Sequence, residues 1–193
     1  MLSQLRPALL ITLVLTVLTG LVYPLTVTGL AQAFFSRQAN GSPATRNGSV
    51  VGSKLIGQNF TGEHYFHPRP SAAGAKGYDA SASGGSNLGP TNPDLEKRLR
   101  KDGSAYRLTN AVTGPVPADA LTTSASGLDP DISPANAQLQ IARVARARHA
   151  DPREIASLVE GQIRGRDWGI FGEPRVDVLQ LNLALDERFP LHQ

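Results

Sequence analysis

Two histidines, His64 and His67, flank an aromatic pair and are the first residues whose type and spacing could do chemistry. Imidazoles this close together could be two ligands of one metal ion. No acidic residue falls at a metalloprotease spacing, however, and Pro68 disfavours a helix at this point. We therefore expect no metal site, and a loop that packs through its aromatic side chains.

A second candidate is the run Ser83-Gly84-Gly85-Ser86-Asn87, which is flexible and rich in hydrogen-bond donors. Such a loop could wrap an anion with its backbone N–H groups. Glycines also serve sharp structural turns, because they adopt positive φ without strain. We expect the glycines of this loop to be structural.

Enzymatic machinery is not visible in the sequence. A phosphate-binding P-loop ends in Gly-Lys-Ser or Gly-Lys-Thr, and none of the four lysines follows a glycine. No serine or threonine can be matched with a base and an orienting group. We expect a protein with no catalytic activity of its own.

Two acidic residues, Asp129 and Asp131, flank Pro130 just before Ser133. Their carboxylate oxygens could hold a cation. Acidic residues before a helix are also favoured by the helix dipole, and this second interpretation is the one we expect.

Composition excludes two further classes of site. There is no cysteine, so disulfides, thiolate metal sites and thiol nucleophiles are impossible. The net charge is +3, but the basic residues do not form the runs interleaved with aromatic residues that nucleic-acid-binding proteins carry. We expect no nucleic-acid partner.

The N-terminal part of the chain has no charged residue between Arg6 and Arg37. Such a stretch is long enough to cross a hydrocarbon core of about 30 Å. It predicts a short N-terminal segment at 1–7, a transmembrane helix at 8–33 and one soluble domain at 37–193. Ala31-Gln32-Ala33 fits a signal-peptide cleavage pattern, but the apolar run exceeds that of a signal peptide. Arg6 favours a cytoplasmic N-terminus and an external soluble domain.

Inside this segment, small or kink-forming residues recur at every fourth position: Thr12, Thr16, Gly20, Pro24 and Thr28. Residues four apart drift by about 40° per step on an α-helix. The resulting stripe is typical of helix pairs whose backbones approach closely. We predict that it packs against a partner helix, with a kink at Pro24. The alternative is that such residues are simply tolerated in membrane spans.

The soluble part mixes irregular and regular structure. Residues 40–93 are rich in Gly, Ser, Asn and Pro, with short apolar runs at 50–51, 55–56 and 65–66 that suit brief strands. A charged helix is predicted over 93–101, capped by Asn92, before a turn-rich segment over 102–123.

Two closely spaced helices are predicted next, one capped by Ser133 that runs to about His149 and one capped by Asp151. In the first, Ala137, Ile141, Val144 and Ala145 share the apolar face, and Arg143 and Arg146 are expected to point to solvent or a partner. Alternation after Val176 predicts a strand, followed by a last helical turn capped by Asn182. The fold class is α+β or α/β, with one transmembrane helix and a loop-rich soluble domain.

Seven short segments, in order along the chain, closely resemble the KdpC subunits of the Kdp potassium-transporting P-type ATPase. They are Leu5-Arg6-Pro7-Ala8, Gly20-Leu21-Val22-Tyr23-Pro24-Leu25, Gly57-Gln58-Asn59-Phe60, Tyr65-Phe66-His67-Pro68-Arg69-Pro70-Ser71, Ser83-Gly84-Gly85-Ser86-Asn87-Leu88, Ser124 to Pro134 and Val178 to Asp186. Each segment is weak evidence alone, and the seven together are specific.

The resemblance implies an accessory subunit of a complex in the bacterial inner membrane, needed for assembly and activity. Its partners would be a potassium-channel-like subunit, a P-type ATPase subunit that hydrolyses ATP, and a small single-span subunit. For the family, a catalytic-chaperone role that raises the ATP affinity of the pump subunit has been proposed.

If nucleotide is bound, the resemblance directs attention to Gln140 and to Ser83, Gly84 and Gly85. An external domain could not reach cytoplasmic ATP, and neither place carries a positive charge for phosphates. We therefore rank assembly and ion entry above nucleotide binding, and expect no firmly bound cofactor. The alternative from another class is a free-standing, membrane-anchored extracytoplasmic binding module, which would purify without large partners.

Overall fold

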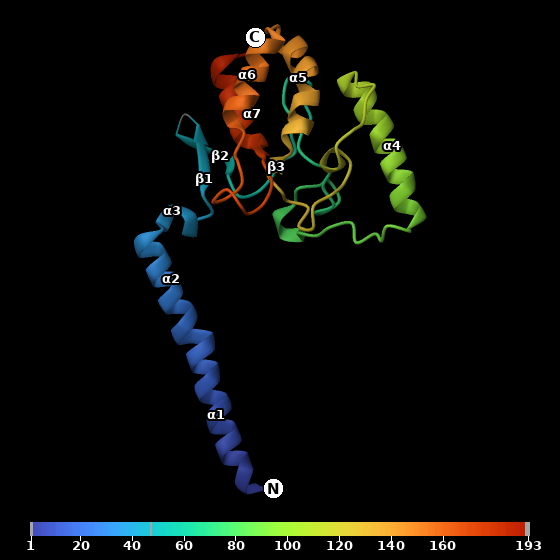
Figure 1. Ribbon diagram of the computed structural model, residues 1–193. Helices are drawn as coiled ribbons and strands as arrows, with labels where there is room; N and C mark the ends of the chain where they lie inside the picture. Colours follow the sequence, from blue (N-terminus) through green and yellow to red (C-terminus); the bar gives the residue numbers. More distant parts are fainter. Residues whose placement is uncertain (1, 47, 192–193) are drawn as a thin grey trace. The chain divides into compact units, whose positions relative to one another are not determined.

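The computed structural model describes residues 2–46 and 48–191, and the chain divides into two compact units, 1–51 and 52–193 (Figure 1). Each unit is described by itself. The predicted limits of 8–33 for the membrane span and 37–193 for the soluble domain remain predictions.

The first unit is dominated by an apolar helix. A 3₁₀ turn, η1 (Leu2–Gln4), leads into α1 (Leu5–Val17), a wider π-helical turn, η2 (Leu18–Val22), and α2 (Tyr23–Phe34). By length and composition, Leu5–Phe34 could cross a membrane, and none of its most apolar window is buried within the protein. A short helix, α3 (Ser36–Ala39), and a two-stranded sheet of β1 (Pro43–Arg46) and β2 (Ser49–Ser53) follow.

Pro24 explains why the helix widens just before it. A proline has no N–H to donate and its ring collides with the carbonyl four residues earlier, here that of Gly20. The helix adapts by a π-type turn, in which the Tyr23 N–H bonds to the Leu18 carbonyl five residues back. The hydroxyls of Thr19 and Thr26 bond to the carbonyls of Leu15 and Val22.

The second unit contains four longer helices: α4 (Pro93–Asn110), α5 (Pro134–Arg148), α6 (Pro152–Gln162) and α7 (Val178–Arg188). Two short strands, β3 (Asp131–Ile132) and β4 (Val176–Asp177), pair antiparallel, and 3₁₀ turns lie at η3 (Ala80–Ala82) and η4 (Ala118–Ala120). The predicted α+β class is confirmed. Helices α5, α6 and α7 lie side by side, and α4 stands farther out (Figure 1).

The starts of three helices match the sequence prediction. The side chains of Asn92, Ser133 and Asp151 each accept a hydrogen bond from a backbone N–H two or three residues on. A proline follows each cap at the first helical position, where its missing N–H has no helical partner to lose.

The core lies between α5, α6 and α7 and the irregular segment around Phe66. Its buried apolar residues are Phe66, Ile132, Ala137, Val144, Ala145, Ile155, Leu158, Val159, Val176, Val178, Leu181 and Leu185. This is a small core, and the long loops outside it depend on polar contacts.

Helix α4 corrects the prediction of a helix that ends at residue 101. Gly103 and the polar residues after it indicated turns, yet the helix continues to Asn110. Gly103 is buried, and a β-carbon there would lie 3.5 Å from the side chain of Leu121. The Tyr106 hydroxyl bonds to Asn136 on α5 at 2.8 Å. Such tertiary contacts outweigh the roughly 1 kcal/mol helix penalty of a glycine.

Helix α7 corrects the predicted strand after Val176. The strand is only two residues long, because Asp177 accepts a hydrogen bond from the Gln180 N–H and caps a helix. The buried residues 178, 181 and 185 have helical spacing, which a short apolar run does not separate from a strand. Asn182, expected as a cap, lies inside the helix. The predicted strands at 55–56 and 65–66 are also wrong, whereas 50–51 belongs to β2.

The pairing of β3 with β4 places Asp131 opposite Asp177. Burial, with Asp177 and Asp129 nearby, raises the pKa of Asp131, although Arg175 and Arg164 oppose the rise. Burial also raises the pKa of Asp177. A raised pKa means that the folded protein holds the proton more tightly than the unfolded chain does, so stability falls as pH rises.

We predict that Asp131→Asn increases the free energy of unfolding at neutral pH. The gain should disappear as pH falls towards about 3.9, the ordinary pKa of aspartate, because wild-type Asp131 is then also neutral. Urea unfolding of the detergent-solubilised chain across this pH range, followed by circular dichroism, measures it. A variant less stable at neutral pH would show that the ion pair with Arg175 outweighs the repulsion.

Candidate functional site

An irregular segment, 62–68, runs through the second unit and is held by side chains of α5 and α7 instead of by a neighbouring strand. The Phe66 N–H donates to Asn182 Oδ1 at 2.9 Å, and Asn182 Nδ2 donates to the Phe66 carbonyl at 3.0 Å. Asn182 thus pairs with both polar groups of one residue, as a strand would. It is 1% exposed, so these bonds form in the interior.

Gln140 does the same for the next residue. Its Oε1 accepts the His67 N–H at 2.7 Å, and its Nε2 donates to the His67 carbonyl at 3.1 Å. The same amide also bonds to Arg143 at 2.7 Å and to Asn136 at 3.0 Å. Gln140 is 1% exposed, and its side-chain amide makes four hydrogen bonds, which is the full number that an amide can form.

Arg143 joins this segment to α4. Its guanidinium donates to the carbonyls of Glu63 and Tyr65 and to Asn110 Oδ1 at the end of α4. Burial lowers the pKa of Arg143 to about 10, which leaves it charged at neutral pH. The prediction that Arg143 faces solvent or a partner is therefore wrong: it is 5% exposed.

Arg148 binds the same part of the segment and joins it to α7. It forms an ion pair with Asp186 on α7 at 2.6 Å and donates to the carbonyls of His64 and Phe189. Its guanidinium carbon lies 5.0 Å from the centre of the Tyr65 ring. The Arg148 side chain has no exposed surface, so losing Asp186 would leave a buried charge without its counter-ion.

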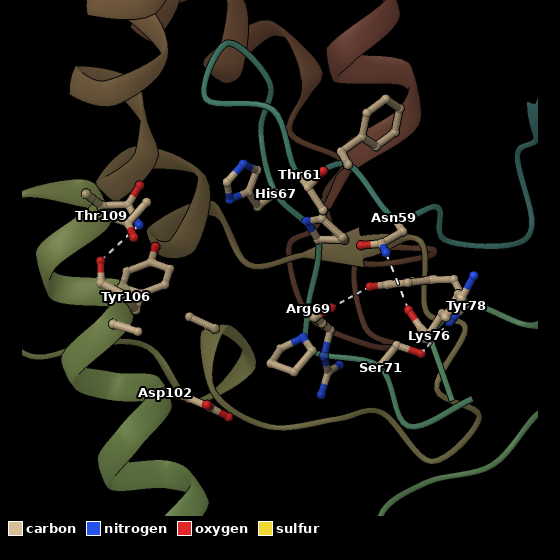
Figure 2. A pocket seen from close by; sticks show the side chains of 17 residues that line it. Asn59, Thr61, His67, Arg69, Ser71, Lys76, Tyr78, Asp102, Tyr106 and Thr109 are labelled. Carbon is tan, nitrogen blue, oxygen red and sulfur yellow. Dashed lines mark hydrogen bonds between the residues drawn. The ribbon is translucent and has the colours of Figure 1, made fainter. Parts of the chain in front are cut away.

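A cavity of about 380 Å³ lies between the segment after residue 59 and α4. Figure 2 shows Asp102, Tyr106 and Thr109 on the wall formed by α4, with His67, Arg69 and Tyr78 on the opposite wall. Lys76 and Asn59 lie at the far side, where the Asn59 amide donates to the Lys76 carbonyl at 3.4 Å.

The polar groups around this cavity mostly serve the fold. Ser71 Oγ donates to the Gly127 carbonyl and accepts the Tyr78 N–H. Arg69 pairs with Asp129 at 2.7 Å, and its Nε is buried without a hydrogen-bond partner in the described part of the chain.

Three titratable groups of the cavity wall have shifted pKa values. Burial raises the pKa values of Tyr78 and Tyr106 and lowers the pKa of His67. In each case burial favours the uncharged form of the side chain. These three groups therefore offer hydrogen-bonding atoms to a polar ligand.

A family model described as KdpC, the c chain of the K⁺-transporting ATPase, matches residues 5–187. The chain belongs to the KdpC family. It is 55% identical to a potassium-transporting ATPase KdpC subunit of Gemmatimonas aurantiaca over 96% of this chain and 94% of that protein. It is 57% identical to a KdpC subunit of Rhodospirillum rubrum over 99% of both chains, and 54% identical to one of Koribacter versatilis over 98% and 97%.

The residues that the family resemblance indicates for nucleotide have different neighbours in the fold. Gln140 is not in the cavity wall, and Ser83, Gly84 and Gly85 lie along residues 124–127. The Gly84 N–H bonds to the Ser126 carbonyl at 2.8 Å, and a β-carbon at Gly85 would lie 3.1 Å from two carbonyl oxygens. Close backbone packing thus accounts for Gly85, and a nucleotide role for the four residues remains a prediction.

The other candidates in this KdpC-family chain also have structural partners. The His64 ring packs on Tyr65 at 4.4 Å, and His67 Nε2 lies 3.0 Å from the Gly62 carbonyl. Among the described residues, no cluster of three His, Cys, Asp or Glu side chains could hold a metal. Asp129 pairs with Arg69 and accepts the Asp131 N–H. The stripe from Thr12 to Thr28 is exposed along the apolar helix, and its packing role stays a prediction.

Sequence analysis missed Asn182, Arg148 and the inward direction of Arg143. One signal could have found Arg148, because Ala137, Gln140, Val144 and Arg148 share a helical face by their spacing. Polar residues on an otherwise apolar face indicate buried hydrogen-bond partners. The partners themselves, carbonyls of 63–67, have no signature in sequence.

We predict that Gln140→Ala lowers the free energy of unfolding by about 2–4 kcal/mol, because it leaves the His67 peptide and Arg143 with unmatched polar groups. Chemical unfolding of the solubilised chain measures the loss. Gln180→Ala is the matched control: among the described residues the buried Gln180 amide nitrogen has no hydrogen-bond partner, so its removal should change stability little. A stable Gln140→Ala protein would reopen the possibility that Gln140 serves a ligand.

Proposed function

We propose that this chain is an accessory, non-catalytic subunit of an ATP-driven potassium uptake complex, needed for the assembly and activity of that complex. The observation that carries the proposal is the family match over residues 5–187, which includes both the apolar helix and the folded unit. Relatives named as potassium-transporting ATPase KdpC subunits match over nearly their whole length.

The proposed partners are a potassium-channel-like subunit, a P-type ATPase subunit that hydrolyses ATP and a small single-span subunit, all in a bacterial inner membrane. The folded unit supports a non-catalytic role, because Gln140, Arg143, Arg148 and Asn182 bind the protein's own backbone. A free-standing binding module is the competing function, and it would purify alone.

A catalytic-chaperone role with bound ATP ranks lower in our proposal. The Gln140 amide could contact a nucleotide only by giving up bonds to His67 and Arg143. The Gly84 N–H likewise donates a hydrogen bond to the Ser126 carbonyl. Because these groups already have partners within the chain, we favour a role in assembly over nucleotide binding at the residues that the resemblance indicates.

We place the N-terminus in the cytoplasm and the folded unit outside. A single cysteine at Leu108, which is 86% exposed on α4, tests this in a chain without native cysteine. Leu108→Cys should react with a membrane-impermeant maleimide on intact spheroplasts, whereas Ser3→Cys should react only after lysis. The reverse pattern would overturn the topology and bring the folded unit into contact with cytoplasmic ATP.

The apolar helix, Leu5–Phe34, is proposed to bind partner helices through the stripe from Thr12 to Thr28. The π-helical turn at Leu18–Val22 changes the alignment of this stripe. A π-helix has more residues per turn than an α-helix, so each residue is rotated by a smaller angle about the helix axis. Gly20 and Pro24 therefore lie nearer to alignment than the α-helical drift would give. A β-carbon at Gly20 would meet nothing within 4 Å among the described residues, so added bulk there points away from the rest of the chain and towards a partner.

We predict that Gly20→Leu loosens the subunit from its complex, since close backbone packing supplies the specificity of helix pairs in lipid. Co-purification of the tagged chain with the polytopic subunits measures retention. Leu18→Ile, which lies off the stripe, is the control and should be retained. If both variants stay in the complex equally, the stripe has no packing role; if even the wild-type chain purifies alone, the subunit proposal itself fails.

A further inference from the structure

A hairpin, residues 164–175, connects α6 to β4. Its two limbs are joined by bridges between Arg164 and Arg175 and between Asp167 and Phe171. Ion pairs from Arg166 to Glu173 and from Arg175 to Asp167 hold the limbs together. The hairpin is thus an ordered projection with its own internal contacts.

The tip of this hairpin is apolar and faces water. Trp168 is 90% exposed, Ile170 71% and Phe171 59%. The Trp168 and Phe171 rings meet edge to face, with centroids 6.0 Å apart. Neighbouring exposed apolar side chains of this size mark contact sites for proteins or membranes.

The backbone conformation at position 168 is unfavourable for a tryptophan. Trp168 and Gly169 occupy the centre of the turn with φ of 53° and 77°, and the Ile170 N–H bonds to the Asp167 carbonyl. Turns with two positive φ values favour Asn-Gly, because asparagine enters this region easily and bulky residues do not. Asparagine would be the more stable residue at position 168 of this turn. We therefore attribute the tryptophan to a contact with something outside the chain.

We propose that this tip inserts into the interfacial layer of a lipid bilayer. Tryptophan is favoured at the boundary between headgroups and acyl chains, where one ring meets both apolar and polar surroundings. Arg164 and Arg166 are both about half exposed, so their guanidinium groups can meet lipid phosphates at the membrane surface in addition to their ion pairs with Asp177 and Glu173.

The position of the hairpin on the folded unit supports lipid as the occupant. Residues 35–51 connect this unit to the apolar helix, which keeps it near a membrane. Near the start of this unit, the charge of Lys54 opposes the burial that raises the pKa of Asp177, and Asp177 pairs with Arg164 at the base of the hairpin. A tip of three side chains is also small for a protein interface, which takes roughly 20–30 residues a side.

The chain carries its own probe, because Trp168 is its single tryptophan. The full-length chain is reconstituted alone into phosphatidylcholine vesicles with a minority of phosphatidylglycerol. We expect Trp168 emission to be blue-shifted relative to a denatured sample, protected from acrylamide, and quenched more by lipids brominated near the headgroup than by lipids brominated near the chain end. Free acrylamide access without quenching by bromolipids would overturn the proposal.

Two sets of variants sharpen the test. Ile170→Ser with Phe171→Ser should reduce bromolipid quenching of Trp168, whereas Leu108→Ser, which removes a still more exposed apolar residue from α4, should not. Equal quenching in both would contradict insertion. If Trp168 stays in water in vesicles and is shielded only after the partner subunits are added, the occupant is a protein and the lipid proposal fails.

Trp168→Asn tests whether Trp168 serves membrane contact or the stability of the folded chain. Asparagine suits the positive φ, so this variant should have an unchanged or higher Tm in detergent. A lower Tm would show that Trp168 stabilises the folded chain, and the argument for an external role would be lost.

Discussion

The folded unit depends on one arrangement: side-chain amides and guanidinium groups hydrogen-bond the backbone of an irregular segment in the protein interior. Buried N–H and C=O groups must find partners, and sheets normally provide them. Here Asn182 and Gln140 pair with Phe66 and His67, and Arg143 and Arg148 take the carbonyls before them. The segment can therefore cross the core without a neighbouring strand.

This arrangement also positions the outer elements. Arg143 reaches Asn110 at the end of α4, and the Tyr106 hydroxyl meets Asn136, so α4 is fastened to α5 through polar contacts. The cavity lies between α4, fastened in this way, and the segment after residue 59. Several of its wall residues, such as Ser71 and Arg69, also make contacts that hold the fold together.

The most buried polar side chains of the folded unit are hydrogen-bonded within the chain. Gln140 and Asn182, for example, bind the backbone of residues 66 and 67. The apolar helix and the tip of the hairpin, by contrast, expose large apolar side chains. The proposed contacts with partner helices and with lipid use these exposed surfaces.

The sequence by itself determined the features that arise from neighbouring residues. The uncharged stretch before Arg37, the caps at Asn92, Ser133 and Asp151, and the ordered family segments are all local, and the caps and the family are confirmed. Only the tertiary structure decided whether residues 178–186 form a strand or a helix, because Asp177 and burial against Phe66 settle a pattern that fits both.

The inward direction of Arg143 was also beyond the sequence. Its acceptors lie 78 and 80 residues away along the chain, in a segment without regular structure. A periodic pattern reports which face of a helix is apolar, but not that a charged side chain on that helix will meet carbonyl groups. Long-range hydrogen bonds to an irregular backbone leave no periodic trace, and they were decided by packing alone.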